Sequence, residues 1–216
     1  MKKIGILGSG KVGEVLANGF LGHGYAVMRG SRDPGKLAAW KAAAKGDAQT
    51  GTFAEAAAWA DIAVLAVKGT GAEPAVREAG AANLAGKLVI DTTNPIADAP
   101  PKNGALSYFT GANESLIGRL QALAPEARFV KAWNSVGNTV MVNPKLGATP
   151  SMFICGADAG AKQQAAEILT QFGWEAVDVG GIEMGYAVEA LCILWCSPGF
   201  LHNDWVHALK VLHPAS

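Results

Sequence analysis

Charged residues are scarce in this sequence, and the two signs balance. Only 17% of the residues are charged, and 18 lysines and arginines stand against 18 aspartates and glutamates. Without an excess of either sign, the chain offers no electrostatic surface that would attract nucleic acid or an anionic membrane. Half of the residues are hydrophobic, which predicts a large buried core and argues against disorder.

Cysteine is also rare. The chain has Cys155, Cys192 and Cys196, and this small, odd number predicts free thiols in a reducing compartment rather than a disulfide framework. Cys192 and Cys196 are four residues apart on a predicted helix, so their side chains point the same way. Because only a single histidine lies near them in the sequence, we expect buried thiols there and no metal site.

Long apolar runs of the kind found in signal peptides and membrane spans are missing. The run Ile4–Leu7 breaks at Gly8 and is too short for the hydrophobic region of a signal peptide. The most apolar stretch, Ala187–Leu201, is interrupted by Glu189 and Pro198, so we expect it not to cross a bilayer. These absences together predict a cytoplasmic protein with no membrane partner.

Strand-like and helix-like patterns alternate along the whole chain, with no internal repeat and no low-complexity linker. Such alternation indicates βαβ units with right-handed crossovers, and therefore an α/β fold with a doubly wound, mainly parallel sheet. We expect one domain over residues 1–180 and a short helical C-terminal segment, residues 181–216, packed on it. The predicted strands are Lys3–Leu7, Tyr25–Met28, Gln49–Gly51, Asp61–Val67, Leu88–Asp91, Arg128–Ala132, Met152–Cys155 and Trp174–Val179. The predicted helices are Val12–Leu21, Asp33–Trp40, Phe53–Trp59, Asp158–Phe172, Ile182–Trp195 and His202–Leu212.

A glycine-rich motif follows the first predicted strand and opens the first predicted helix: Gly8-Ser9-Gly10-Lys11-Val12-Gly13. It fits G-x-G-x-x-G, in which Gly8 makes the tight turn, Gly10 lets the backbone approach a pyrophosphate and Gly13 lets the helix pack on the strand. Free N–H groups and the macrodipole at the helix N-terminus favour an anion. A plain strand-to-helix turn is the alternative, but the context favours a dinucleotide site and a Rossmann-type domain.

The end of the second predicted strand lacks the acidic residue that usually binds the ribose hydroxyls of NAD. It reads Gly30-Ser31-Arg32, and Lys36 follows one turn into the next helix. A hydroxyl and a guanidinium there suit a 2′-phosphate, because arginine makes planar, charge-assisted contacts with phosphate. Asp33 is a rival ribose ligand, but its neighbour Pro34 favours a role as helix N-cap. The sequence therefore favours NADP(H) over NAD(H).

Ligands of open α/β sheets lie beyond the carboxyl ends of the strands. This rule selects three segments, which are Ala66-Val67-Lys68, Thr92-Thr93-Asn94-Pro95 and Trp133-Asn134-Ser135. Asn94 and Asn134 are candidate contacts for the nicotinamide amide or for an acceptor ring, and capping of their own loops is the alternative. Lys68 is a candidate contact for phosphate or substrate, or a solvated loop lysine.

The sequence contains no evident pair of nucleophile and base. Hydride transfer between two cofactors needs none, since the cofactors carry the chemistry and the protein orients them. We therefore expect a planar redox acceptor rather than a simple ketone. The long connection 94–112, which contains Pro95, Pro100 and Pro101, is predicted to be a lid over the two rings.

These residues resemble a known family, the NADP oxidoreductases that depend on the deazaflavin coenzyme F-420. The resemblance is carried by the glycine motif, by Ser31, Arg32 and Lys36, and by later segments. Those later segments are Phe153–Asp158, Gly173 and Asp178-Val179-Gly180. The second half also resembles the cytosolic NADPH-binding domain of the six-transmembrane metalloreductases, but with no membrane segment we do not expect their full activity here. The chain differs from the archaeal oxidoreductases at Ser9-Gly10-Lys11 and at Ala132-Trp133-Asn134-Ser135.

The resemblance implies hydride transfer between NADPH and a deazaflavin or flavin. Two alternatives stay open. One is an NADPH-dependent reductase of a small imine or carbonyl substrate, although the C-terminal segment is short for the large helical domain that such enzymes carry. The other is a non-catalytic module that senses NADP(H). The apolar C-terminal segment, with Trp195, Phe200, Leu201 and Trp205, also predicts a homodimer.

Overall fold

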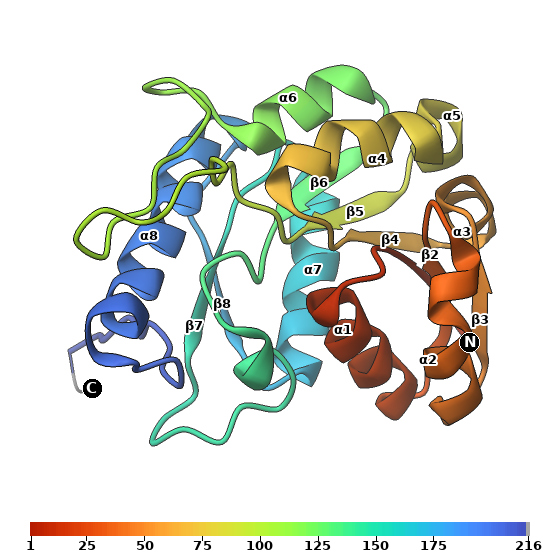
Figure 1. Cartoon of the computed structure of the whole chain (residues 1–216), viewed down its shortest axis with the longest axis horizontal. Helices are drawn as coiled ribbons and strands as arrows, with labels where there is room; N and C mark the ends of the chain where they lie inside the picture. The colour runs from red at the N-terminus through yellow and green to blue at the C-terminus, as the bar shows by residue number, and fades with distance from the viewer. Residues whose placement is uncertain (215–216) are drawn as a thin grey trace.

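The computed structural model describes residues 1–214 and has a six-stranded parallel sheet at its centre (Figure 1). The strand order is β3-β2-β1-β4-β5-β6, in which the chain starts at the centre and winds outward in both directions. This order confirms the predicted doubly wound α/β fold. The strands are β1 (Lys3–Leu7), β2 (Ala26–Gly30), β3 (Ala48–Gly51), β4 (Ile62–Leu65), β5 (Leu88–Asp91) and β6 (Arg128–Lys131).

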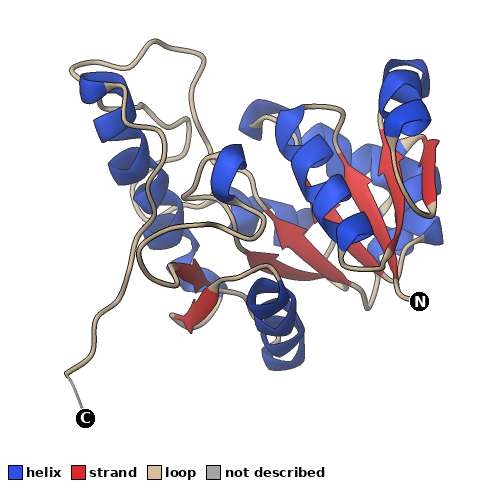
Figure 2. Cartoon of the chain, turned by 90° about the horizontal axis from the view of Figure 1, so that it is seen from below, coloured by secondary structure: helices blue, strands red, loops and turns tan. Residues whose placement is uncertain are grey.

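Helices cover both faces of the sheet (Figure 2), as parallel strands require. One face packs against α1 (Lys11–Gly22), α2 (Ala38–Ala43) and α7 (Ala159–Gln171). The other face packs against α3 (Phe53–Trp59), α4 (Ala72–Ala79), α5 (Ala81–Leu84) and α6 (Leu116–Leu123). Alternate residues of each strand supply the two cores, so that Ile6 belongs to the first and Leu7 to the second.

Local sequence signals account for several helix starts. Thr52 and Glu55 form a reciprocal capping box at the first turn of α3, and this contact lowers the pKa of the Glu55 carboxyl. Asp158 accepts a hydrogen bond from the Ala161 N–H and caps α7. Asp33 caps a short 3₁₀ turn at Pro34–Leu37 in the same way, which is the role that Pro34 indicated.

A second, two-stranded parallel sheet lies beside the first. It consists of β7 (Ser151–Ile154) and β8 (Glu175–Asp178), which α7 connects. A single antiparallel bridge between Lys131 and Cys155 links this pair to β6. The predicted strands in this region are confirmed, but they form a separate pair rather than an extension of the main sheet.

The C-terminal segment differs from the prediction. Helix α8 (Gly185–His202) continues past the expected end at Trp195 and stops at Asn203, which adopts a left-handed conformation (φ 55°). The predicted helix His202–Leu212 is absent, and residues 203–212 form neither helix nor strand. Tertiary contacts explain this, because the Ser151 N–H donates to the Leu209 carbonyl along the edge of β7. The predicted division of the chain at residue 180 stays a prediction, and residues 215–216 of the segment lie outside the described part.

Helix α8 with its preceding turn, Ile182–His202, is long and apolar enough to cross a membrane by length and composition alone. Buried helices of soluble proteins pass the same test, so a single such helix is weak evidence for a membrane span. Glu189 near its middle is 1% exposed and is 2.9 Å from the ammonium of Lys131 on the main sheet. The helix is therefore tied into the protein core at that point.

The long connection 94–112 is a compact loop whose two ends are held together. Ile96 and Tyr108 form a bridge, and the Tyr108 hydroxyl donates to the carbonyl of Glu189 on α8 (2.5 Å). Its tip lies against α8, because a Cβ on Gly104 would be 2.9 Å from Leu201. The loop thus connects the carboxyl edge of the sheet to α8.

Candidate functional site

The glycine loop lies where β1 ends and α1 begins, at the carboxyl edge of the sheet. Gly8 and Gly13 are required by close packing, since a Cβ on Gly8 would be 2.1 Å from the Ala66 carbonyl oxygen. A Cβ on Gly13 would be 2.6 Å from the carbonyl oxygen of Gly8. Gly10 differs, because nothing lies within 4 Å of an added Cβ. The backbone at Gly10 therefore faces open space, where the glycine motif places a pyrophosphate.

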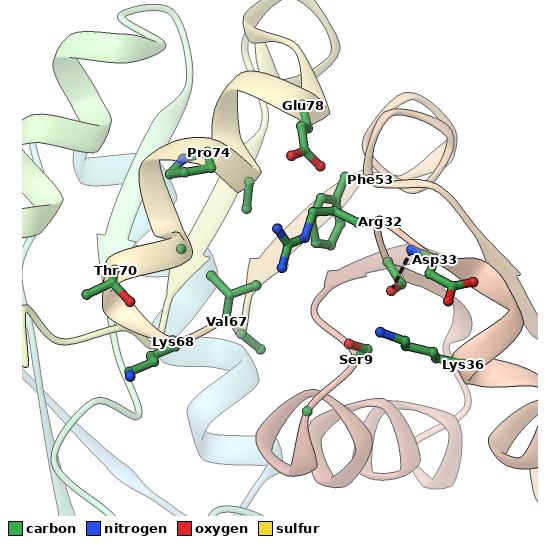
Figure 3. A pocket seen from close by; sticks show the side chains of 15 residues that line it. Ser9, Arg32, Asp33, Lys36, Phe53, Val67, Lys68, Thr70, Pro74 and Glu78 are labelled. Carbon is green, nitrogen blue, oxygen red and sulfur yellow. Dashed lines mark hydrogen bonds between the residues drawn. The ribbon is translucent and has the colours of Figure 1, made fainter. Parts of the chain in front are cut away.

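Beside this loop is a cavity of about 690 Å³ (Figure 3). It is bounded by the glycine loop, by the segment after β2, by the segment after β4 and by the first turns of α4. Its predicted lining residues are Ser9, Gly10, Ser31, Arg32, Lys36, Ala66, Val67 and Lys68. The structure thus brings together three segments that are far apart in the sequence, and the volume is typical of a pocket for a small molecule or cofactor.

The cationic side of the cavity comes from the end of β2. Figure 3 shows the Arg32 guanidinium extending toward Val67 and the Lys36 ammonium extending toward Ser9. Both are exposed, and neither makes an ion pair within residues 1–214. Ser31 is buried at 3% exposure, and its hydroxyl accepts the Asp33 N–H at 3.1 Å. Two cations without a carboxylate partner are thus available to an anion at this end of the cavity.

Apolar side chains form another part of the cavity lining. Phe53, Val67, Pro74 and Ala75 line it, together with one carboxylate, Glu78. A flat aromatic ring fits against such a wall, whereas a phosphate fits the cationic side. The sequence does not identify Phe53, Pro74 and Ala75 as lining residues, because nothing in the pattern of α3 and α4 marks which side chains face a cavity.

The other glycine-loop residues support the site without lining the cavity. Val12 and Gly13 belong to the first turn of α1, and Lys11 forms an exposed ion pair with Glu14 (3.0 Å).

Lys68 is at the cavity rim and forms an ion pair with Asp98 of the long loop. Exposed pairs of this kind contribute little to stability.

Asn94 and Asn134 lie together, but they do not line this cavity. The Asn94 amide donates to the Asn134 carbonyl (2.7 Å), and the Asn134 amide donates to the Asn94 side-chain oxygen (3.0 Å). Asn134 also donates to the Val188 carbonyl of α8 (2.9 Å). Both amides thus join the loops after β5 and β6 to α8, and their proposed contact with a nicotinamide or an acceptor stays a prediction.

Arg29 is a further residue at the glycine loop that the sequence analysis did not identify. Its side chain is 1% exposed and stacks on Trp40, with the guanidinium carbon 5.0 Å from the ring centroid. Its Nη2 donates to the carbonyls of Gly8 (3.3 Å) and Gly10 (3.1 Å). Burial lowers the pKa of Arg29, and Glu14 opposes that shift. The only feature of the sequence that could have indicated a role for Arg29 was the presence of a charge inside the apolar run 26–30.

A buried network of three charged side chains joins β5, β6 and α8, and the sequence did not indicate it. Lys131 on β6 contacts Asp91 of β5 (2.5 Å) and Glu189 of α8 (2.9 Å), and all three are at most 1% exposed. Glu189 also accepts the backbone N–H groups of Leu116 and Ile117 at the start of α6, each at 2.9 Å. Burial alone would lower the pKa of Lys131, but Asp91 and Glu189 outweigh it and hold that pKa above its ordinary value.

The thiols lie apart from the cavity. The sulfur atoms of Cys192 and Cys196 are 3.8 Å apart on α8, and Cys155 is fully buried. Burial raises the pKa of Cys155 to about 11, whereas a hydrogen bond from Cys192 lowers the pKa of Cys196. Among residues 1–214, no group of three or more His, Cys, Asp or Glu residues is arranged to hold a metal ion.

Comparison with known proteins agrees with this geometry. The family described as "NADP oxidoreductase coenzyme F420-dependent" matches residues 3–95. A crystal structure from Arthrobacter sp. FB24, of a protein assigned as an F420-dependent NADP reductase, is 30% identical. The match covers 99% of this chain and 100% of the other, with a TM-score of 0.92.

Two further matches are to proteins longer than this chain. Metalloreductase STEAP3 of Rattus norvegicus is 28% identical over 195 residues, a match that covers 88% of this chain and 36% of STEAP3. The chain thus spans about a third of that relative's length. An imine reductase from Streptomyces aurantiacus is 14% identical, with a TM-score of 0.64 over 89% of this chain and 60% of the other. At that identity the likeness concerns the fold alone.

Proposed function

Because the chain belongs to the family of F420-dependent NADP oxidoreductases, and is thus an NADP-dependent oxidoreductase, we propose that it transfers a hydride between NADPH and a flavin-like acceptor. The acceptor would be the deazaflavin coenzyme F-420 or a flavin. NADPH would lie along the carboxyl edge of the sheet, with its adenosine in the cavity beside the glycine loop. When bound, it supplies the hydride, and the residues of this chain bind and orient it.

The observation that carries the proposal is the unpaired cationic side of the cavity. Arg32 and Lys36 extend into it with no carboxylate partner among residues 1–214, and the buried Ser31 hydroxyl lies beside them. A 2′-phosphate there would receive charge-assisted hydrogen bonds from both cations. Asp33, the one acid at this strand end, has its Oδ1 engaged by the Gly35 N–H, which favours NADP(H) over NAD(H).

The rest of the dinucleotide fits the same edge. Phe53, Val67 and Pro74 provide an apolar wall for the adenine ring. The open space at Gly10 would hold the pyrophosphate, because the N–H groups at the start of α1 are free of helical partners. In this arrangement the nicotinamide points past Lys68 toward the loop after β5 and the long loop 94–112.

The acceptor is inferred from the family and from the side chains near that end. Asn94 and Asn134 are bonded to each other, and they are amides rather than acids. A ring that takes a hydride without a proton from the protein suits such a site better than a carbonyl. The imine-reductase alternative rests on a likeness of fold, and sensing of NADP(H) without turnover is the third possibility to be tested.

The cofactor assignment is tested by Arg32→Ala. The loss of charged hydrogen bonds to the 2′-phosphate should weaken NADPH binding by on the order of 2 kcal/mol, roughly 30-fold, measured by titration calorimetry. NADH binding should be unchanged. Arg128→Ala is the matched control, since Arg128 is half-exposed at the opposite end of the sheet. Equal affinities of the native protein for NADPH and NADH would contradict the assignment.

The acceptor is tested by stopped-flow oxidation of NADPH. Deazaflavin, free flavin and a panel of imines and carbonyls are compared in parallel. Fast turnover with deazaflavin or flavin is expected. Turnover confined to an imine or carbonyl would establish the reductase alternative instead, and tight NADPH binding with no turnover in any mixture would favour the sensor.

We also propose that the protein acts as a homodimer in the cytoplasm. The supporting observation is the exposed apolar side of α8, where Leu194 is 65% exposed and Leu201 is 54% exposed. Burial of such side chains in a second copy would be favourable. Light scattering at micromolar concentration should give twice the monomer mass, and a monomer would contradict the proposal.

A further inference from the structure

The guanidinium of Arg29 lies on the inner side of the glycine loop. It donates to the carbonyls of Gly8 and Gly10 through one nitrogen, and it rests on the Trp40 ring. We propose that Arg29 is a positioning residue for the pyrophosphate of the dinucleotide, which fixes the loop peptides and places a positive charge behind them. The inference rests on the proposed function, because it requires a dinucleotide at this loop.

Peptide geometry explains how bonds on the inner side act on the outer side. In a planar trans peptide, the carbonyl and the following N–H point in opposite directions. When Arg29 holds the Gly8 and Gly10 carbonyls inward, the N–H groups of Ser9 and Lys11 therefore point outward. Within residues 1–214 neither N–H has a protein acceptor, and the space outside Gly10 is open. Two outward donors are thus fixed where an anion would bind.

The charge of Arg29 contributes a second effect. The side chain is buried and forms no ion pair within the described residues, and its Nε has no hydrogen-bond partner. A buried cation without a carboxylate is costly, and burial lowers the pKa of Arg29 accordingly. A pyrophosphate on the other side of the loop would compensate that charge. This site therefore offers a reason to keep an arginine inside an otherwise apolar strand.

The effect of Arg29 differs from that of Arg32, and the difference provides the test. Arg32 is expected to act on the 2′-phosphate, whereas Arg29 is expected to act on the pyrophosphate. Two fragments of the cofactor separate these groups. ADP-ribose has a pyrophosphate and no 2′-phosphate, and 2′-AMP has a 2′-phosphate and no pyrophosphate.

Arg29→Met, which keeps the apolar stem and removes the charge and the donors, should weaken ADP-ribose and NADP⁺. We expect about tenfold or more for both, the size of one partly screened charge pair. Affinity for 2′-AMP should change by less than about twofold. Arg32→Ala should show the reverse pattern, with 2′-AMP and NADP⁺ weakened and ADP-ribose unchanged. Each variant thus serves as the control of the other.

Calorimetric titration of the three ligands, with circular dichroism to confirm folding, decides the question. Equal weakening of all three ligands by Arg29→Met, or no weakening, would overturn the role of Arg29. If the Met variant does not fold, Arg29→Lys replaces it, because it keeps the charge but cannot hold the loop with a planar fork. It should weaken ADP-ribose severalfold and leave 2′-AMP unchanged, and a uniform change would again overturn the proposal.

Failure of the proposed function is visible separately. A native protein that binds neither NADP⁺ nor ADP-ribose would refute the dinucleotide site before any variant is compared. A native protein that binds both, with an Arg29→Met variant that behaves like the native one, would refute Arg29 alone.

Discussion

Lys131→Met should be strongly destabilising, because Lys131 is the one cation in the buried network with Asp91 and Glu189. Its ammonium has three hydrogen-bond donors and three acceptors, which are Asp91 Oδ2 (2.5 Å), Glu189 Oε1 (2.9 Å) and the Thr93 carbonyl (2.8 Å). Methionine fills the space of the stem, so the variant creates little cavity. It leaves two carboxylates in the core without a cation.

Removing one partner of a buried ion pair costs about 3–5 kcal/mol, because the remaining charge is not compensated. Here the start of α6 compensates part of it, since Leu116 and Ile117 donate to Glu189. We therefore expect about 3 kcal/mol at pH 7, the lower end of that range. Such a loss is a large fraction of the 5–15 kcal/mol typical of whole domains.

The assay is urea unfolding at pH 7, followed by tryptophan fluorescence and circular dichroism. Adding Asp91→Asn should restore some stability at pH 7, because one uncompensated carboxylate is removed. Lys45→Met, at an exposed lysine, is the control. A loss below about 1 kcal/mol, unaffected by the second substitution, would refute the reasoning.

For native Lys131, the pH dependence has a definite sign. The pKa of Lys131 is raised in the folded protein, so its contribution to stability is fully present below the ordinary lysine value of about 10.4. That contribution is lost as the pH rises through the higher folded value. Alkaline unfolding curves should therefore show a steeper loss of stability above about pH 10.4 in the native protein than in Lys131→Met.

Three further predictions concern single sites. Gly10→Val should fold, since the added side chain meets open space, but it should lose NADPH binding in fluorescence titration. Gly13→Val should unfold or lose stability, because its Cβ would lie 2.6 Å from a carbonyl oxygen. Thr52→Ala should lower the free energy of unfolding by about 1 kcal/mol in urea titrations through loss of the N-cap of α3; an unchanged value would show that the cap is dispensable. Iodoacetamide at pH 8 should modify Cys196 before Cys155. Cys196 is partly exposed and its pKa is lowered, whereas Cys155 is buried and its pKa is raised to about 11. Mass spectrometry that shows the opposite order of modification would contradict this prediction.

Much of the fold and part of the site could be predicted from the sequence, because their signals are local. The alternating strand and helix patterns, the glycine motif and the N-caps Asp33 and Asp158 each depend on residues a few positions apart. The predicted residues Ser31, Arg32 and Lys36 lie in one cavity with Ser9 and Gly10, because the carboxyl ends of neighbouring parallel strands meet at one edge. The position of that edge follows from the fold class, so the glycine motif and the fold class together predicted where the cavity lies.

The tertiary structure alone decided what depends on distant partners. The helix predicted over His202–Leu212 is absent, because Leu209 pairs with Ser151 at the edge of β7 and those non-local bonds outweigh a local helical pattern. Arg29 was indistinguishable from any charge near a strand end until its bonds to the glycine loop were seen. For Asn94 and Asn134, the structure shows a contact that the sequence does not specify, because the Asn134 amide donates to the side-chain oxygen of Asn94, 40 positions away. Their contact with a ligand stays a prediction. Glu189 and Lys131 are 58 positions apart, and no periodicity in either segment specifies which buried charge meets which; only the packing of α8 on the sheet does.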